Sequence, residues 1–113
     1  PAIKVCPTTV RIPVFRGHSE SVNIETEKPI DVDEVKEVLS KTKGVLLVDN
    51  PKENVYPLAI NCKDRDGVFV GRIRRDETVE NGLNMWIVAD NLLKGAALNA
   101  VQIAEKMIEM DLI

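Results

Sequence analysis

A change of hydrophobic period near the C-terminal end constrains the fold more than any other feature of this sequence. Residues 84–89 read Asn-Met-Trp-Ile-Val-Ala, a nearly continuous apolar run that is typical of a buried, central strand. From Asp90 onward the apolar residues recur at helical spacing instead. Asp90 is a good N-cap, and about nineteen residues at 1.5 Å rise per residue predict a helix of roughly 28 Å. The fold must therefore place a central strand directly before its longest helix.

Five further segments have the composition of strands. Residues 4–12 are rich in Val, Thr and Ile, although Pro7 indicates an edge strand or a bulge. Residues 19–26 alternate apolar and polar side chains, which predicts a half-buried strand. The other three are the short apolar run 45–48, the stretch 55–61 around Pro57, and residues 68–74, where Gly71 indicates a bulge or a close backbone approach.

A short helix is expected among these strands. Asp31 can cap its first turn, Glu34 completes a capping-box pattern, and Lys41 and Gly44 are typical of its end. Residues 63–67, Lys-Asp-Arg-Asp-Gly, predict a hairpin turn. The resulting order is β-β-α-β-β-β-β-α with several short links. This order predicts an α+β fold, with a mixed, largely antiparallel sheet, one short helix and a long C-terminal helix.

Composition argues against several classes of function. The net charge is -3 and the charges are interspersed, so neither nucleic acid nor an extended charged partner is expected. No apolar run approaches the roughly 20 residues that cross a bilayer, so no membrane is expected. Cys6 and Cys62 lack CxxC spacing, and with a single histidine they predict no metal site. Free thiols in a reducing cytoplasm are the expected state, and a single bridge between the two cysteines is the alternative.

The only histidine, His18, lies in the polar segment 11–21, between two expected strands. Turns between strands collect functional residues, and the guanidinium of Arg11 or Arg16 can bind a carboxylate or phosphate through two parallel hydrogen bonds. Spacing alone leaves a surface or packing role for His18 beside a catalytic one. In a straight strand Arg11 and His18 would lie about 23 Å apart. Joint action therefore requires the chain to bend around residues 13–17.

Three blocks of the sequence resemble the aspartate-β-semialdehyde dehydrogenases. Residues 9–22, Thr-Val-Arg-Ile-Pro-Val-Phe-Arg-Gly-His-Ser-Glu-Ser-Val, resemble the histidine motif of that family. Residues 68–74 resemble its later strand, and residues 90–105, which begin Asp-Asn-Leu-Leu-Lys-Gly-Ala-Ala, resemble its C-terminal helix. The blocks occur in family order, and the resemblance covers essentially the whole chain. Residues 55–61 and 80–84 favour the bacterial type.

The resemblance implies an NADP-dependent oxidoreductase that reductively dephosphorylates L-aspartyl-4-phosphate to L-aspartate-4-semialdehyde and phosphate. That reaction serves the synthesis of lysine, methionine, threonine and diaminopimelate. The implied enzyme is a cytoplasmic homodimer or homotetramer with a Rossmann-type coenzyme domain. Residues 1–89 would be the C-terminal part of its catalytic and dimerisation domain. Residues 90–113 would be a terminal helix that packs on the coenzyme domain and exposes an apolar face without it.

The same resemblance assigns roles to three residues. His18 matches the general acid/base, and imidazole suits that task because it exchanges protons in either direction near neutral pH. Arg11 matches the arginine that holds the substrate α-carboxylate, which fixes the reacting carbon. Asn91 matches a position at the nicotinamide end of NADP. Arg16 has no matched role and is expected to be a solvated or local structural charge.

The sequence departs from the family in what it lacks. Neither Cys6 nor Cys62 lies in the Asn-Cys-Ser/Thr context of the family nucleophile, so Cys62 is expected to be structural. The glycine-rich coenzyme loop, the catalytic glutamine and the phosphate-binding lysine are also missing. The chain is therefore expected to be a C-terminal fragment that is inactive alone. The alternatives are a fragment of N-acetyl-γ-glutamyl-phosphate reductase and a non-catalytic α+β module for oligomerisation or ligand sensing.

Overall fold

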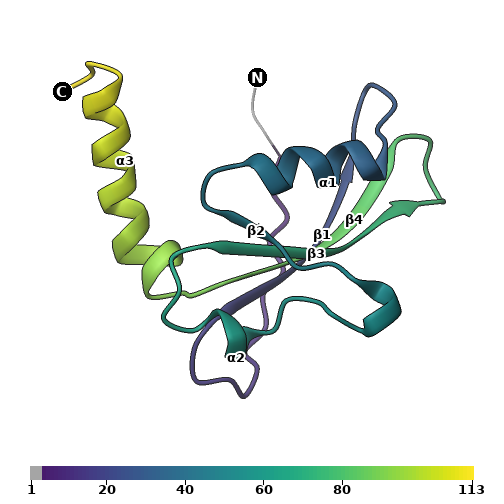
Figure 1. Ribbon diagram of the computed structural model, residues 1–113, viewed down its shortest axis with the longest axis horizontal. Coiled ribbons are helices and arrows are strands. Elements are labelled where there is room, and N and C mark those ends of the chain that lie inside the picture. The colour runs from purple at the N-terminus through teal and green to yellow at the C-terminus, as the bar shows by residue number, and fades with distance from the viewer. Residues whose placement is uncertain (1–3) are drawn as a thin grey trace.

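The computed structural model describes residues 4–113 and contains a four-stranded mixed sheet (Figure 1). The strands, in the spatial order β1-β4-β3-β2, are β1 (His18–Glu25), β4 (Gly82–Ala89), β3 (Val68–Asp76) and β2 (Val45–Leu47). β4 pairs antiparallel with both β1 and β3, whereas β2 pairs parallel with β3. The predicted α+β fold with a largely antiparallel sheet is confirmed, and β4 is an interior strand as its apolar sequence indicated.

Helices lie on both sides of the sheet. The helical elements are α1 (Val32–Lys41), the 3-10 turn η1 (Pro51–Glu53), α2 (Ala59–Cys62), the π-helical turn η2 (Leu93–Ala97) and α3 (Leu98–Glu109). In Figure 1, α1 lies above the sheet and α2 below it. The predicted cap of α1 is confirmed, because the Asp31 carboxylate accepts the N–H groups of Asp33 and Glu34 over 2.8 and 3.1 Å.

The side of the sheet that faces α2 carries a small hydrophobic core. Phe69 of β3 and Val88 of β4 are paired in register there, and both are buried against Cys62. Trp86 packs beside them, and its indole N–H donates to the carbonyl of Pro57 over 3.1 Å. The indole is thus hydrogen-bonded as well as packed, which fixes the 57–62 segment on the sheet.

Gly71 shows both features that its position in a strand predicted. The β3–β4 register shifts between Gly71 and Arg74, which is a bulge. An ideal Cβ on Gly71 would lie only 2.1 Å from the carbonyl oxygen of Val48 and 2.6 Å from Cδ of Pro57. Glycine is therefore required for β3 to pass this close to the chain that follows β2.

Two of the predicted strands are absent. Residues 4–12 belong to no ladder, and their large side chains are open to solvent, as Val5 and Val10 show at 80% and 83% exposure. Strand composition alone cannot order this segment, because no other described strand lies alongside to accept its hydrogen bonds. Residues 55–61 are extended only in part, since the chain turns into α2 once it has passed Pro57.

The predicted hairpin at residues 63–67 is also wrong. This segment leads from α2 into β3, and the strand that precedes it, β2, runs parallel to β3. Asp64 has a left-handed φ of 60°, so the turn chemistry is present. The turn connects a helix to a strand, because the parallel pairing of β2 excludes a two-strand hairpin here.

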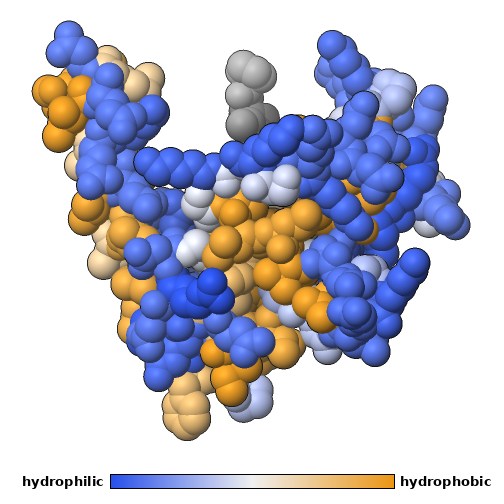
Figure 2. Space-filling view, viewed as in Figure 1, coloured by the Kyte–Doolittle hydropathy of each residue, from blue (hydrophilic) through white to orange (hydrophobic). Residues whose placement is uncertain are grey.

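The C-terminal helix differs from the single long helix expected from Asp90. The N–H of Gly95 bonds to the carbonyl of Asp90 over 3.1 Å, and that of Ala97 bonds to Leu92 over 3.2 Å. In each bond the donor lies five positions after the acceptor, which is the spacing of a π-helix, so the chain makes a π-helical turn before α3 begins. In Figure 1, α3 projects away from the sheet, and Figure 2 shows hydrophobic surface along it and at the centre of the same face. No described helix is long and apolar enough to cross a membrane.

Candidate functional site

The chain bends before β1, as joint action of Arg11 and His18 required. The N–H of Val14 donates to the carbonyl of Ile12 over 2.9 Å, which closes a tight turn. Gly17 then has a φ of +106°, a conformation that favours glycine. His18 follows as the first residue of β1, with its side chain exposed. The predicted bend within residues 13–17 is confirmed.

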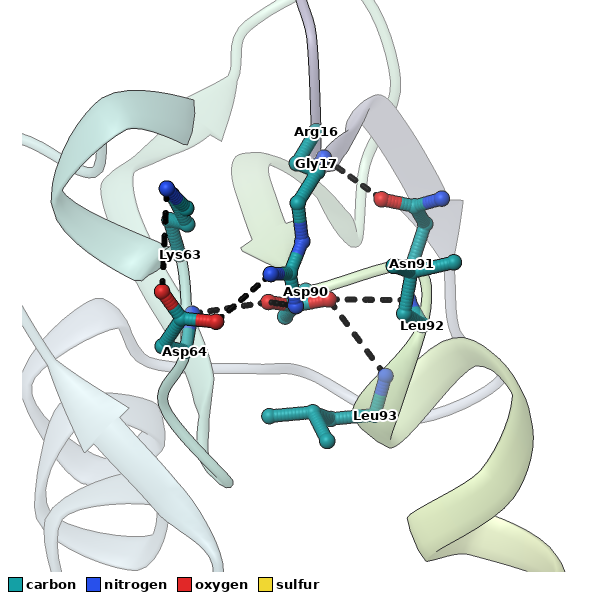
Figure 3. A network of polar contacts seen from close by, with 8 residues as sticks. All are labelled: Arg16, Gly17, Lys63, Asp64, Asp90, Asn91, Leu92 and Leu93. Atoms are coloured by element: carbon teal, nitrogen blue, oxygen red, sulfur yellow. Dashed lines mark hydrogen bonds and ion pairs between the residues drawn. The ribbon is translucent and has the colours of Figure 1, made fainter.

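A buried carboxylate fastens this bend to the start of the C-terminal helix (Figure 3). The side chain of Asp90 is fully buried, and its Oδ2 lies 2.5 Å from Nη2 of Arg16. The same oxygen accepts the N–H of Asp64 over 2.8 Å. Its Oδ1 accepts the N–H groups of Leu92 and Leu93 over 2.8 and 3.3 Å. A buried carboxylate with one cation and three N–H donors has the partners that it needs to stay charged.

The ionisation of this pair follows from its surroundings. Burial raises the pKa of the Asp90 carboxyl, but the N–H groups of Asp64 and Leu92 and the guanidinium of Arg16 lower it further, to about 2. The pKa of Arg16 is raised, chiefly by its hydrogen bond to Asp90. Arg16 also contacts the exposed carboxylate of Asp64 over 2.6 Å. Both members of the pair are therefore charged across the physiological range of pH.

Asn91 and His18 lie next to one another at the junction where the bend before β1 meets the turn that follows β4. Oδ1 of Asn91 accepts the N–H of Gly17, the residue before His18, over 2.7 Å. An ideal Cβ on Gly95 would lie 3.6 Å from Nδ1 of His18 and 3.8 Å from Cβ of Asn91. The imidazole and the Asn91 side chain thus flank the same glycine of η2. In Figure 3 the amide nitrogen of Asn91 points away from Gly17, so it is oriented to donate elsewhere.

Arg11 is the one predicted site residue that this network does not include. It lies in the exposed segment before the bend, and its guanidinium has no hydrogen bond or ion pair with any described residue. The structure therefore brings together two of the three residues expected from the sequence. Asp90 was expected only as a helix cap, and Arg16 as a local charge. An acidic residue at the end of a buried strand signals a helix cap, and nothing in the sequence signals its pairing with Arg16.

The two cysteines occupy different environments, and both are free. Cys6 is exposed, whereas Cys62 is buried in the core. Burial raises the pKa of the Cys62 thiol, although the charge of Arg65 acts in the opposite direction. A thiol that stays protonated is a poor nucleophile, which agrees with a structural role. The described residues contain no cluster of three His, Cys, Asp or Glu side chains that could hold a metal ion.

A groove of about 470 Å³ lies on the sheet near this junction but does not include it. It is lined by side chains of β1, β3, β4 and the 56–59 segment, among them Ser19, Ser21, Arg72 and Trp86. Neither His18 nor Asn91 contributes to its wall. The candidate catalytic residue His18 therefore lies outside the groove, at the first residue of β1, where its imidazole is exposed.

A family profile described as "Semialdehyde dehydrogenase, dimerisation domain" matches residues 1–94. The chain belongs to this family. It is 59% identical over 111 residues to the aspartate-semialdehyde dehydrogenase of Aquifex aeolicus, which covers 98% of this chain and 33% of that protein. It is 55% identical over 105 residues to the enzyme of Legionella pneumophila, which covers 92% of this chain and 30% of that protein. The chain thus spans about a third of the curated relatives that it matches.

The fold of this semialdehyde dehydrogenase family member agrees with solved structures. A crystal structure of aspartate semialdehyde dehydrogenase II from Vibrio cholerae, complexed with ASA, superposes with a TM-score of 0.80 at 43% identity. The match covers 87% of this chain and 29% of that chain. The family expected from the sequence motifs is confirmed, and the relatives do not favour N-acetyl-γ-glutamyl-phosphate reductase.

Proposed function

We propose that this chain is part of an NADP-dependent aspartate-semialdehyde dehydrogenase, which reductively dephosphorylates L-aspartyl-4-phosphate in the synthesis of lysine, methionine, threonine and diaminopimelate. The observation that carries the proposal is the 2.7 Å hydrogen bond from Gly17 to Asn91. It places an exposed imidazole, that of His18, beside the side chain expected at the coenzyme. The names and identities of the relatives support the same activity.

His18 would transfer the protons of the reaction. The nucleophilic thiol loses a proton when it attacks, and the oxygen of the resulting thiohemiacetal exchanges one. A neutral imidazole can accept the first proton, and the imidazolium can donate it again. The exposed position of His18 at the start of β1 leaves the ring accessible to a substrate.

Arg11 would hold the substrate, and Asn91 would contact the coenzyme. The planar guanidinium of Arg11 can bind the α-carboxylate of aspartyl phosphate or aspartate semialdehyde through two hydrogen bonds. Because Oδ1 of Asn91 is occupied by Gly17, its amide N–H groups can donate to the carboxamide of nicotinamide. NADP, when bound, supplies or accepts the hydride.

The remaining parts of the enzyme would lie in the two thirds of the relatives that this chain does not span. We assign residues 1–89 to the catalytic and dimerisation domain, and residues 90–113 to a terminal helix that packs on the coenzyme domain. The exposed apolar side chains of α3, including Val101, Ile103 and Ile108, support that assignment. The family's description as a dimerisation domain supports a homodimer or homotetramer, and we expect it in the cytoplasm.

Substitution of His18 in the whole enzyme tests the proposal. We expect His18→Ala to lower kcat for the phosphate-dependent oxidation of aspartate semialdehyde by about 100-fold or more, because general acid/base catalysis contributes that much. Glu20→Ala is the control, since Glu20 is exposed two residues further along the same strand. Normal turnover by His18→Ala would contradict the assignment. Turnover by the isolated 113 residues with NADP would show that no further part is needed.

A further inference from the structure

We propose that the buried Arg16–Asp90 ion pair is the positioning device of this site, in which Asp90 fixes His18 through the bend before β1 and Asn91 through the turn after β4. The inference rests on the proposed function and extends it to two residues that have no role in it. Neither Arg16 nor Asp90 would touch the reacting atoms. Each would act through a neighbour in the sequence.

The ladder between β1 and β4 leaves His18 at its last rung. His18 pairs with Ala89, the final residue of β4, and beyond this pair neither strand supports the other. The two contacts that continue the junction are those of Arg16 with Asp90 and of Gly17 with Asn91. The orientation of a residue at the end of a ladder depends on what holds the chain beyond it. Here that chain is held by a side-chain ion pair.

Asp90 holds the second partner as well as the first. Its Oδ1 accepts the N–H groups of Leu92 and Leu93, so the backbone that follows Asn91 is tied to the side chain of the residue that precedes it (Figure 3). Its other oxygen holds Arg16 and the N–H of Asp64. The imidazole of His18 and the amide of Asn91 are consequently both positioned by the Asp90 carboxylate, although the two residues lie far apart in the sequence.

Burial gives this carboxylate its rigidity. Asp90 has no exposed side-chain surface, and its four donors leave it no alternative partner. A buried ion pair is often replaceable by apolar residues without loss of stability, so stability alone does not account for it. A fixed geometry between an acid/base and a coenzyme contact does account for it, because small displacements at reacting groups reduce the rate strongly.

Variants of the whole enzyme separate positioning from folding. Asp90→Asn removes the charge and keeps one carbonyl oxygen, which can still accept from Leu92 and Leu93, whereas an NH2 group replaces the oxygen that holds Arg16 and the N–H of Asp64. We expect its kcat to fall about 10- to 100-fold and its KM for NADP to rise several-fold, with the KM for aspartate semialdehyde within about twofold of wild type. Arg16→Lys keeps a cation beside Asp90 and should lose only part of kcat. Asp64→Asn is the matched control, since it alters the exposed partner of Arg16 and keeps the backbone N–H that Asp90 binds.

A double-mutant cycle decides whether Asp90 acts through His18. In an enzyme that carries His18→Ala, the further change Asp90→Asn should lower kcat much less than it does in the wild type, because one of the two groups that Asp90 positions is gone. The rise in KM for NADP, which reports on Asn91, should remain. An equal fall in both backgrounds would overturn the inference and leave the proposed function intact. If His18→Ala alone keeps normal activity, the proposed function fails and this inference with it. Circular dichroism establishes folding, and should Asp90→Asn fail to fold, the same cycle with Arg16→Lys gives the answer.

Discussion

The backbone of β3 passes so close to the end of β2 that an ideal Cβ on Gly71 would lie 2.1 Å from the carbonyl oxygen of Val48. The carbonyl of Val48 belongs to the main chain, and the position of a Cβ on residue 71 is fixed by the main chain. Neither atom can therefore rotate away as the end of a side chain would. The parallel β2–β3 pairing and the bulge after Gly71 therefore depend on the absence of a side chain at this position.

Gly71→Ala should destabilise the protein by about 3 kcal/mol or more, because the added methyl group requires the backbone to move. Urea unfolding followed by circular dichroism measures the loss. Gly95→Ala is the matched control: its Cβ would meet nothing nearer than 3.6 Å, and alanine favours a helix. Equal stability of the two variants would show that the close approach at Gly71 is not a constraint.

Arg11→Lys in the whole enzyme should raise the KM for aspartate semialdehyde about tenfold, or ~1.4 kcal/mol, with little change in kcat. An ammonium group cannot reproduce the two parallel hydrogen bonds that a guanidinium gives a carboxylate. Steady-state kinetics with varied semialdehyde provide the measurement, and Arg75→Lys, on the exposed part of β3, provides the control. An unchanged KM would remove Arg11 from the substrate site.

Asn91→Ala in the whole enzyme should affect NADP and turnover together. The variant loses the amide that we expect at the nicotinamide, and it also leaves the N–H of Gly17 without its acceptor. We expect kcat/KM for NADP to fall at least tenfold. Asn91→Asp keeps an oxygen for Gly17 but no N–H donor, so its kcat should exceed that of Asn91→Ala. Identical kinetics for these two variants would show that the bond to Gly17 has no part in the effect.

Local sequence signals predicted those parts of the fold that local chemistry controls. The Asp31 cap, the apolar run of β4 and the glycine of β3 were each recognisable from a few adjacent residues. Pairing between distant segments was not. Residues 4–12 have the composition of a strand but no strand beside them, and the turn at residues 63–67 was assigned to a hairpin although β2 and β3 are parallel.

The candidate site shows the same limit. The family motif identified His18, Arg11 and Asn91, because each lies in a recognisable run of residues. Arg16 and Asp90 are 74 positions apart, and nothing in a single sequence indicates that one neutralises the other. That contact depends on the antiparallel register of β1 with β4, which only the folded sheet defines.

The two thiols should differ in reactivity. Cys6 is exposed and should react with a thiol reagent such as DTNB within minutes in the folded chain. Cys62 is buried and burial raises its pKa, so it should react only after unfolding. Mass spectrometry of peptides after brief labelling distinguishes the two sites, with Cys6→Ser as the control. Rapid labelling of Cys62 under native conditions would contradict the packing of α2 on the sheet.

Asp90 should make the stability of the fold sensitive to acid. The pKa of its carboxyl is about 2 in the folded chain, below the ordinary value of 3.8 that applies after unfolding. A lowered pKa in the folded state contributes stability that is fully present above pH ~5 and is lost as the pH falls through about 4 toward 2. The free energy of unfolding of Asp90→Asn should be lower than that of wild type at pH 7, and the difference should shrink in acid. Urea unfolding at pH 7, 4 and 3 tests this expectation, with Glu20→Gln on the exposed face of β1 as the control. A difference that stays constant from pH 7 to pH 3 would show that the ionised carboxylate does not stabilise the junction.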